Sequence, residues 1–131
     1  MNIQGIKTKY GTLKGRDAIY LNSVMYKNAE LIIKGEVNSE LLSNYDGEQD
    51  FIPYELNFGN VIANYQIELD FYNHSYLEYS FQENTDSDWI KKLKEIDCSN
   101  KINEKHKHFV LATYDDIFEI IAGVYTFNFL E

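Results

Sequence analysis

Residues 54–82 read YELNFGNVIANYQIELDFYNHSYLEYSFQ, and they contain the clearest strand pattern in this chain of 131 residues. Apolar side chains occupy the even positions of residues 54–58 and the odd positions of residues 61–71, a period of two that is typical of β-strands. The phase changes at residues 59–60, a Gly-Asn pair, which predicts a tight hairpin or a bulge. Alternation resumes over residues 76–82, so the sequence predicts a three-stranded meander.

The chain before this stretch is patterned more weakly. Residues 29–36 alternate and predict a short strand that ends at Gly35. Residues 37–42 predict one helical turn, and residues 43–50 (SNYDGEQD) predict a loop built on their Asp-Gly pair. Residues 1–28 predict irregular structure or short edge strands.

After the meander the pattern becomes helical. Thr85 or Asp86 is a candidate N-cap, and the apolar residues that follow form one stripe. We therefore expect an amphipathic helix over about 86–97 that packs on the sheet. Further strands are predicted over residues 108–114, 117–122 and 124–130, with a bulge or bend at the glycine between the last two. The sequence thus predicts a single domain, 1–131, of the α+β class, mainly antiparallel β, with a twisted sheet or an open barrel and this one helix.

Charge is distributed unevenly along the chain. The formal net charge is −9, and residues 35–90 contain twelve carboxylates but no lysine or arginine. Such a segment repels a phosphate backbone, which argues against ordinary nucleic-acid binding. The natural complement is a basic protein or a cationic patch on one.

The meander combines this negative charge with aromatic side chains. Tyr72 and Tyr76 fall outside the apolar phase and are expected to face solvent, where aromatic rings often act as binding hot spots. The expected partner-binding surface therefore consists of Glu68, Asp70, Tyr72, Tyr76 and Glu78, with Asp46, Glu48 and Asp50 as a second patch. The alternative is that these carboxylates form only a solvated face.

The sequence carries no catalytic signature. Asp115 and Asp116 are adjacent, and neighbouring strand residues point to opposite faces, so a turn is favoured over a shared acid/base or metal site. His106 and His108 would share one face of a strand, but zinc needs three or four ligands, so a solvated pair at a loop–strand junction is favoured over a metal site. No phosphate-binding loop or Gly-x-Ser-x-Gly motif is present. We therefore expect no enzyme, no cofactor and no metal.

The cellular setting follows from simple features. The single cysteine, Cys98, excludes an internal disulfide framework and suits a reducing cytosol. The first residues form no apolar signal segment, and no apolar run is long enough to span a membrane. The expectation is a cytoplasmic protein without membrane contact, and the load of Asn, Lys, Ile and Tyr suggests a bacterial source.

Three segments together carry a resemblance to a known class of proteins. They are PYELNFGNVIANYQIELD at residues 53–70, SDWIKKL at 87–93 and HFVLATYDDIFEIIA at 108–122. Their order resembles small bacterial cytosolic proteins of the toxin-immunity type, over about half of the chain. The resemblance implies a binding protein that blocks the basic active site of a cognate toxin, such as a nuclease.

Other function classes stay open at this point. One alternative is a structural or interaction module that forms a homo-oligomer, for example a homodimer built on an edge strand such as 124–130. A small ligand-binding protein and a small enzyme with a cleft beside the helix are further alternatives.

Overall fold

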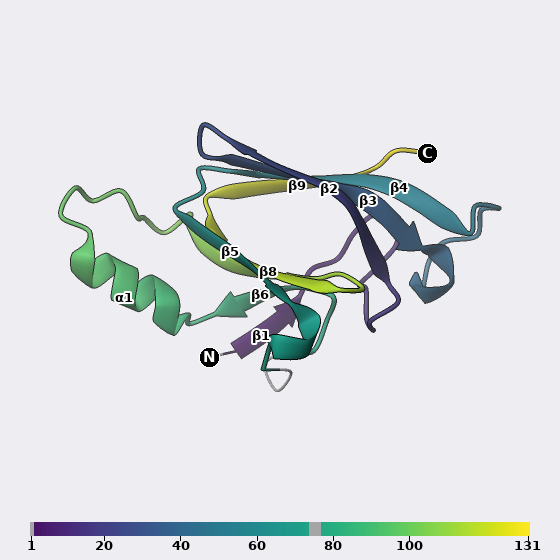
Figure 1. Cartoon of the computed structure of the whole chain (residues 1–131), viewed down its shortest axis with the longest axis horizontal. Helices are drawn as coiled ribbons and strands as arrows, with labels where there is room; N and C mark the ends of the chain where they lie inside the picture. The colour runs from purple at the N-terminus through teal and green to yellow at the C-terminus, as the bar shows by residue number, and fades with distance from the viewer. Residues whose placement is uncertain (1, 74–76) are drawn as a thin grey trace.

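The computed structural model describes residues 2–73 and 77–131, and it contains two antiparallel sheets that pack face to face (Figure 1). The five-stranded sheet has the order β1-β6-β7-β8-β5, and the four-stranded sheet has the order β2-β3-β4-β9. The strands of the first are β1 (Asn2–Gly5), β5 (Ala63–Glu68), β6 (Phe81–Thr85), β7 (Lys107–Ala112) and β8 (Asp116–Ala122). Those of the second are β2 (Ile19–Lys27), β3 (Glu30–Asn38), β4 (Phe51–Gly59) and β9 (Val124–Phe129).

The remaining elements are one helix, α1 (Asp88–Ile96), and two short 3-10 helices, η1 (Ser39–Leu41) and η2 (Leu69–Phe71). The two sheets do not close into a barrel. The expected fold class, mainly antiparallel β with one α-helix, is therefore confirmed.

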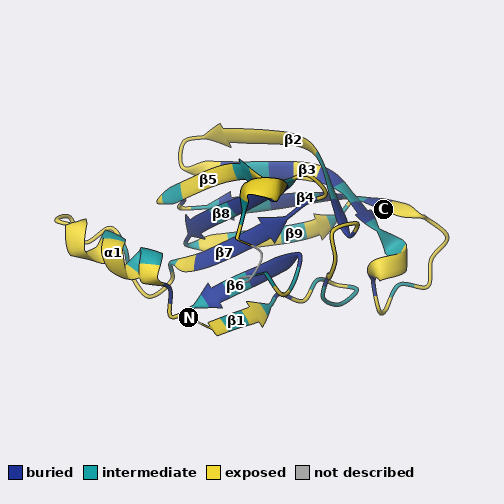
Figure 2. Ribbon diagram, turned by 60° about the horizontal axis from the view of Figure 1, so that its bottom comes forward, coloured by how far each residue is buried: buried dark blue, intermediate teal, exposed yellow. Residues whose placement is uncertain are grey.

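The core lies between the sheets. Alternate residues of each inner strand point inward, because side chains on a strand alternate between its two faces. Phe58 from the four-stranded sheet contacts Phe109 and Phe81 from the five-stranded sheet, with ring centroids 5.3 and 6.2 Å apart. Each fully buried ring of this kind stabilises the fold by roughly 1.5–3 kcal/mol. Figure 2 shows the result, with the central strands buried and β2 and α1 largely exposed.

From residue 29 onward the order is strand, short helix, two strands, short helix, strand, helix and three strands. It differs from the expected order by the added η2, and β6 is Phe81–Thr85 where a strand over residues 76–82 was expected. The first 28 residues contain two strands, β1 and β2. Irregular structure or short edge strands were expected there. Both strands lie at sheet edges. No residue of β1 is fully buried and only Ile19 of β2 is, so neither strand shows a clear alternation of apolar residues.

The predicted meander over residues 54–82 is wrong. β4 pairs with β3 and β9 in one sheet, whereas β5 pairs with β8 in the other. The phase changes between them because the apolar residues of β5 do not face the main core. Ile67 instead packs on the outer face of the five-stranded sheet, in a second apolar cluster with Leu69, Val110 and Ile117.

The chain passes between the sheets three times, between β1 and β2, between β4 and β5, and between β8 and β9, and the last two crossings touch. One follows β4 at Asn60, which has a positive φ of 52°. The other is Gly123, between β8 and β9. The N–H group of Gly123 lies 3.0 Å from the carbonyl oxygen of Gly59 and 3.3 Å from that of Asn60. We call this contact the crossover seam.

Helix α1 begins later than expected and does not lie on the sheet. Its N-cap is Ser87, whose hydroxyl oxygen accepts a hydrogen bond from the Ile90 N–H at 3.1 Å, and not Thr85 or Asp86. The helix projects from one end of the molecule (Figure 1), and none of its residues is fully buried. Trp89 makes its ring contacts with the sheet. In the described ranges, no helix has the length and apolar character needed to cross a membrane.

Candidate functional site

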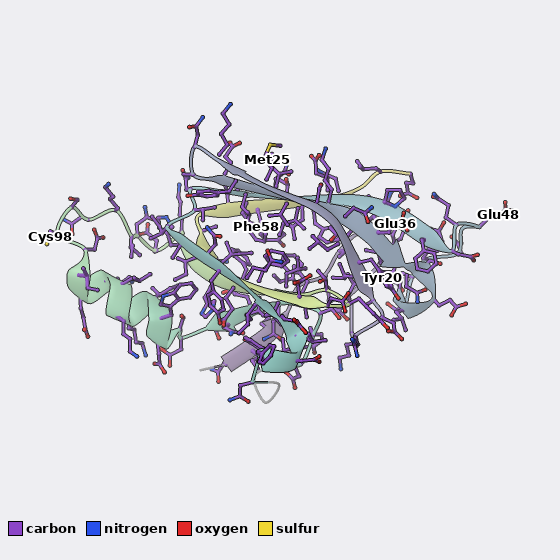
Figure 3. All side chains as sticks on the ribbon, in the orientation of Figure 1. Tyr20, Met25, Glu36, Glu48, Phe58 and Cys98 are labelled. Carbon is purple, nitrogen blue, oxygen red and sulfur yellow. The ribbon has the colours of Figure 1, made fainter. Side chains whose placement is uncertain are left out.

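A groove of about 400 Å³ lies between the start of β2 and the β7–β8 turn. Two of its residues, Tyr20 and Glu36, lie on the side of the molecule away from α1 (Figure 3). Three aromatic side chains and three carboxylates line it, and they come from the start of β2, the end of β3, the start of β4 and the β7–β8 turn. We call it the end groove and define it by Tyr20, Glu36, Phe51, Tyr114, Asp115 and Asp116.

The floor of the end groove depends on a close approach between β2 and β3. Tyr20 lies opposite Glu36 in the strand register, next to Gly35. A Cβ atom on Gly35 would lie 1.8 Å from the Tyr20 carbonyl oxygen, so only glycine fits there. The same carbonyl accepts a hydrogen bond from the buried Tyr54 hydroxyl at 3.1 Å. The close approach of Gly35 and the hydrogen bond from Tyr54 therefore hold the Tyr20 backbone in position.

The opposite wall is the β7–β8 turn. Its backbone is closed by Thr113, whose N–H donates to the Asp116 carbonyl at 2.8 Å and whose hydroxyl oxygen accepts from the Asp116 N–H at 3.1 Å. The expected turn at Asp115 and Asp116 is thus present, although a threonine and not an aspartate caps it. The Tyr114 N–H donates to the Ile19 carbonyl at 2.9 Å, which ties this turn to the other sheet.

The aromatic rings of the end groove form one contiguous surface. The Tyr20 ring stacks on Tyr114 with centroids 5.4 Å apart and meets Phe51 edge-on at 5.7 Å. At the rim, the guanidinium of Arg16 lies 4.5 Å above the Tyr114 ring and 3.6 Å from an Asp115 carboxylate oxygen. A cation held between an aromatic face and a carboxylate is thus already part of this wall.

The groove and its surroundings are strongly negative. Burial, and then the nearby Asp17 and Tyr114, raise the pKa of Tyr20, so its hydroxyl stays neutral. Asp116 accepts a hydrogen bond from Gln66 at 3.0 Å, and within the described part of the chain Glu36 takes part in no ion pair. Figure 3 places Tyr20, Glu36 and Glu48 toward one end of the molecule and Cys98 at the other. Further exposed carboxylates lie on η1 and in the loop that follows it: Glu40, Asp46, Glu48 and Asp50.

The structure separates the expected partner-binding residues into two groups. Asp46, Glu48 and Asp50 are exposed in the loop between η1 and β4, at the acidic end. Glu68 is exposed at the end of β5, and Asp70 and Glu78 line a separate pocket of about 370 Å³.

Tyr72 was expected to face solvent, and that expectation is wrong. Its side chain is half-buried and donates a hydrogen bond toward the Glu119 carboxylate on the outer face of the five-stranded sheet. Tyr76 lies outside the described residues. The alternation that placed Tyr72 outward failed because the strand ends at Glu68 and the chain turns through η2 before Tyr72.

The two histidines also differ from the expected solvated pair. His108 is buried, and its imidazole bonds to Glu119 and Ser87. His106 is half-buried, and its Nδ1 atom accepts from the Asn103 N–H at 3.1 Å. Over residues 2–73 and 77–131, no three His, Cys, Asp or Glu side chains are arranged to hold a metal ion.

The aromatic residues of the end groove were not foreseen from the sequence. Tyr20, Phe51 and Tyr114 lie in three distant segments. The pairing of β3 with β2 and β4, and the hydrogen bond from Tyr114 to Ile19, bring them together. The one feature of the sequence that indicated this groove was Tyr114, an aromatic residue directly before the two aspartates Asp115 and Asp116. Comparisons with protein-family models, with curated proteins and with solved structures found no match to this chain.

Proposed function

We propose that this chain is an acidic binding protein of the immunity type, which blocks the basic active site of a cognate toxin with its end groove. The observation that carries this proposal is the joint presence of three aromatic rings and three carboxylates in one groove. Aromatic faces and carboxylates together bind guanidinium and ammonium groups, which are the groups that line a basic catalytic cleft.

The surrounding charge supports the same function. The carboxylates at Glu40, Asp46, Glu48 and Asp50 extend the negative surface from the groove around the end of the molecule. The net charge of −9 adds a long-range field. Such a field accelerates the encounter with a cationic partner, and salt screens it, so association should be fast at low salt and slower at high salt.

The mechanism is occlusion. A lysine or arginine side chain of the partner enters the end groove and lies on the rings of Tyr20 and Phe51, within reach of Glu36. Arg16 on Tyr114 shows the geometry that such a contact takes. The exposed loop over residues 43–50 covers neighbouring basic residues of the partner, and the active site is then closed to its substrate.

The proposal is tested by capturing proteins from native cell extract, including the secreted fraction, on the immobilised chain at low salt. The wild-type chain is compared with Glu36→Lys/Asp115→Lys, which reverses two charges in the end groove. The matched control is Glu95→Lys/Glu104→Lys, which makes the same change of net charge at exposed positions near α1. We expect a basic protein, released by salt, to bind the wild-type chain and the control, and to bind the groove variant about tenfold more weakly.

Two results would contradict this proposal. Equal binding by the groove variant and the control would show that only net charge matters. A chain that captures no protein but forms a salt-insensitive dimer in light scattering would favour the homo-oligomer instead. That second function has one supporting observation: β9 lies at the edge of its sheet, pairs with β4 in an unbroken register, and contains neither charge nor proline.

A further inference from the structure

A third pocket, separate from the end groove and from the pocket lined by Asp70 and Glu78, lies on the outer face of the five-stranded sheet. Its volume is about 370 Å³, and it is bounded by β5, η2 and the outward-facing residues of β7 and β8. We call it the outer pocket and define it by Tyr65, Ile67, Phe71, Tyr72, His108 and Glu119. Its size is in the range of small-molecule sites.

A buried carboxylate lies at the base of the outer pocket. The Glu119 side chain is only 12% exposed, and its two oxygens accept hydrogen bonds from His108 at 2.6 Å and from Tyr65. Burial alone would raise the pKa of Glu119, but the hydrogen bonds from His108, Tyr65 and Tyr72 outweigh it and hold the pKa below its usual value. The group therefore carries a negative charge at neutral pH.

The imidazole that faces Glu119 is oriented by a second contact. A carboxylate only accepts hydrogen bonds, so His108 presents its Nε2–H to Glu119. Its Nδ1 atom lies 2.7 Å from the Ser87 hydroxyl. These two contacts fix the orientation of the imidazole beside Glu119.

The walls of the outer pocket are aromatic and lack strong cations. Tyr65 is 40% exposed and Phe71 is 76% exposed, so both rings are accessible from solvent. Among the described residues that line this pocket, none is lysine or arginine. Aromatic rings around a carboxylate form the environment that recognises organic ammonium ions.

We propose that the outer pocket is a binding site for a small organic ammonium compound, with Glu119 as the counter-ion and Tyr65 and Phe71 as the aromatic walls. This site goes beyond the blocking of a toxin, since it shares no lining residue with the end groove. It leaves the end groove free for a protein partner.

Three hydrogen-bonded residues are arranged in the order of a hydrolytic triad, but they resemble one in no other respect. Ser87, His108 and Glu119 form a hydroxyl–imidazole–carboxylate chain of the kind that activates a nucleophile. The Ser87 hydroxyl, however, accepts the Ile90 N–H as the cap of α1, and the residue is only 5% exposed. The oxygen is not presented to a substrate, so a binding role for the carboxylate is favoured over acyl transfer.

The experiment uses choline as the probe and the fluorescence of Trp89, the only tryptophan in the chain, as the signal. The Trp89 ring lies 5.8 Å from Tyr65 and 5.3 Å from His108, so it reports on the outer pocket. We expect saturable binding of choline with a Kd of about 1 mM. The neutral isostere 3,3-dimethylbutan-1-ol should bind about tenfold more weakly, since it has the same shape without the charge.

Variants identify the residues responsible. Glu119→Gln should weaken choline binding about tenfold, and Glu83→Gln, a half-buried glutamate of β6 that is not part of the outer pocket, should not change it. Phe71→Ala removes a ring that is 76% exposed, so we expect this variant to fold and to test the site even if Glu119→Gln does not fold. Phe51→Ala is its matched control in the end groove.

The outcomes are decisive in both directions. Choline binding that exceeds isostere binding and falls in Phe71→Ala supports the site. A short peptide with trimethyl-lysine, titrated in parallel, shows by tighter or weaker binding than choline whether the ammonium belongs to a protein segment or to a free compound. Equal binding of choline and the isostere, or binding unaffected by both Phe71→Ala and Glu119→Gln, would overturn the proposal.

Discussion

Glu36 and Glu119 are both half-buried glutamates on strands, but their surroundings differ completely. Glu119 accepts hydrogen bonds from His108, Tyr65 and Tyr72 on the outer face of its sheet. Glu36 lies in the end groove and forms no ion pair within the described residues. The comparison shows two settings for negative charge in this chain: hydrogen bonds from the fold itself hold Glu119 at the base of the outer pocket, whereas Glu36 has no ion-pair partner among the described residues.

The largest expected effect comes from removing the support of the end groove. In Gly35→Ala the new Cβ would lie 1.8 Å from the Tyr20 carbonyl oxygen, so β2 has to move away from β3. We expect the free energy of unfolding in urea to fall by about 3 kcal/mol or more. Phe51→Ala, which trims the same groove at an exposed side chain, should lower it by less than about 1 kcal/mol. Equal values for the two variants would show that the β2–β3 approach is not needed for stability.

The next effect separates the two glutamates directly. Glu119→Gln leaves His108 and two tyrosine hydroxyls facing a neutral amide, and we expect a loss of about 2 kcal/mol in the free energy of unfolding. Glu36→Gln should change it by no more than about 0.5 kcal/mol, since no described partner is lost. Urea denaturation of both variants measures the difference. If Glu36→Gln lowered the free energy of unfolding as much as Glu119→Gln does, Glu36 would also have a structural role and the distinction between the two glutamates would fail.

The smallest effect is a dependence of stability on pH. The folded state holds the pKa of Glu119 below the value that the same group has in the unfolded chain. Its contribution is therefore complete above the unfolded pKa and is lost as the pH falls through the folded pKa. Unfolding curves collected from pH 6 downward should show a steeper acid loss for the wild type than for Glu119→Gln. Parallel curves would mean that Glu119 takes no part in the acid transition.

The sequence predicted local structure well and long-range pairing poorly. Alternation over residues 54–58 and 61–71 located β4 and β5, because the period of two depends only on which side chains a strand buries. The same alternation does not say which cluster buries them. Ile67 belongs to the outer cluster and Phe58 to the core, so two strands that are adjacent in sequence joined different sheets.

The candidate sites show the same limit. The acidic loop with Asp46, Glu48 and Asp50 was identified because its exposure follows from composition alone. The end groove was not identified from the sequence, because Tyr20 and Tyr114 meet only through the contact between the β7–β8 turn and β2. Tyr72 was placed outward because nothing in the pattern indicates that the chain leaves the strand before it.

The crossover seam has a consequence for the rate at which the chain folds. The Gly123 N–H reaches the carbonyls of Gly59 and Asn60, so the contact joins residues that are far apart in the sequence. Closing such a loop requires the intervening chain to lose entropy before either sheet is complete. Folding of a mainly antiparallel domain with pairings of this range takes milliseconds to seconds. We therefore expect the seam to form late on the folding pathway, and substitutions at Asn60 to accelerate unfolding more than they slow folding.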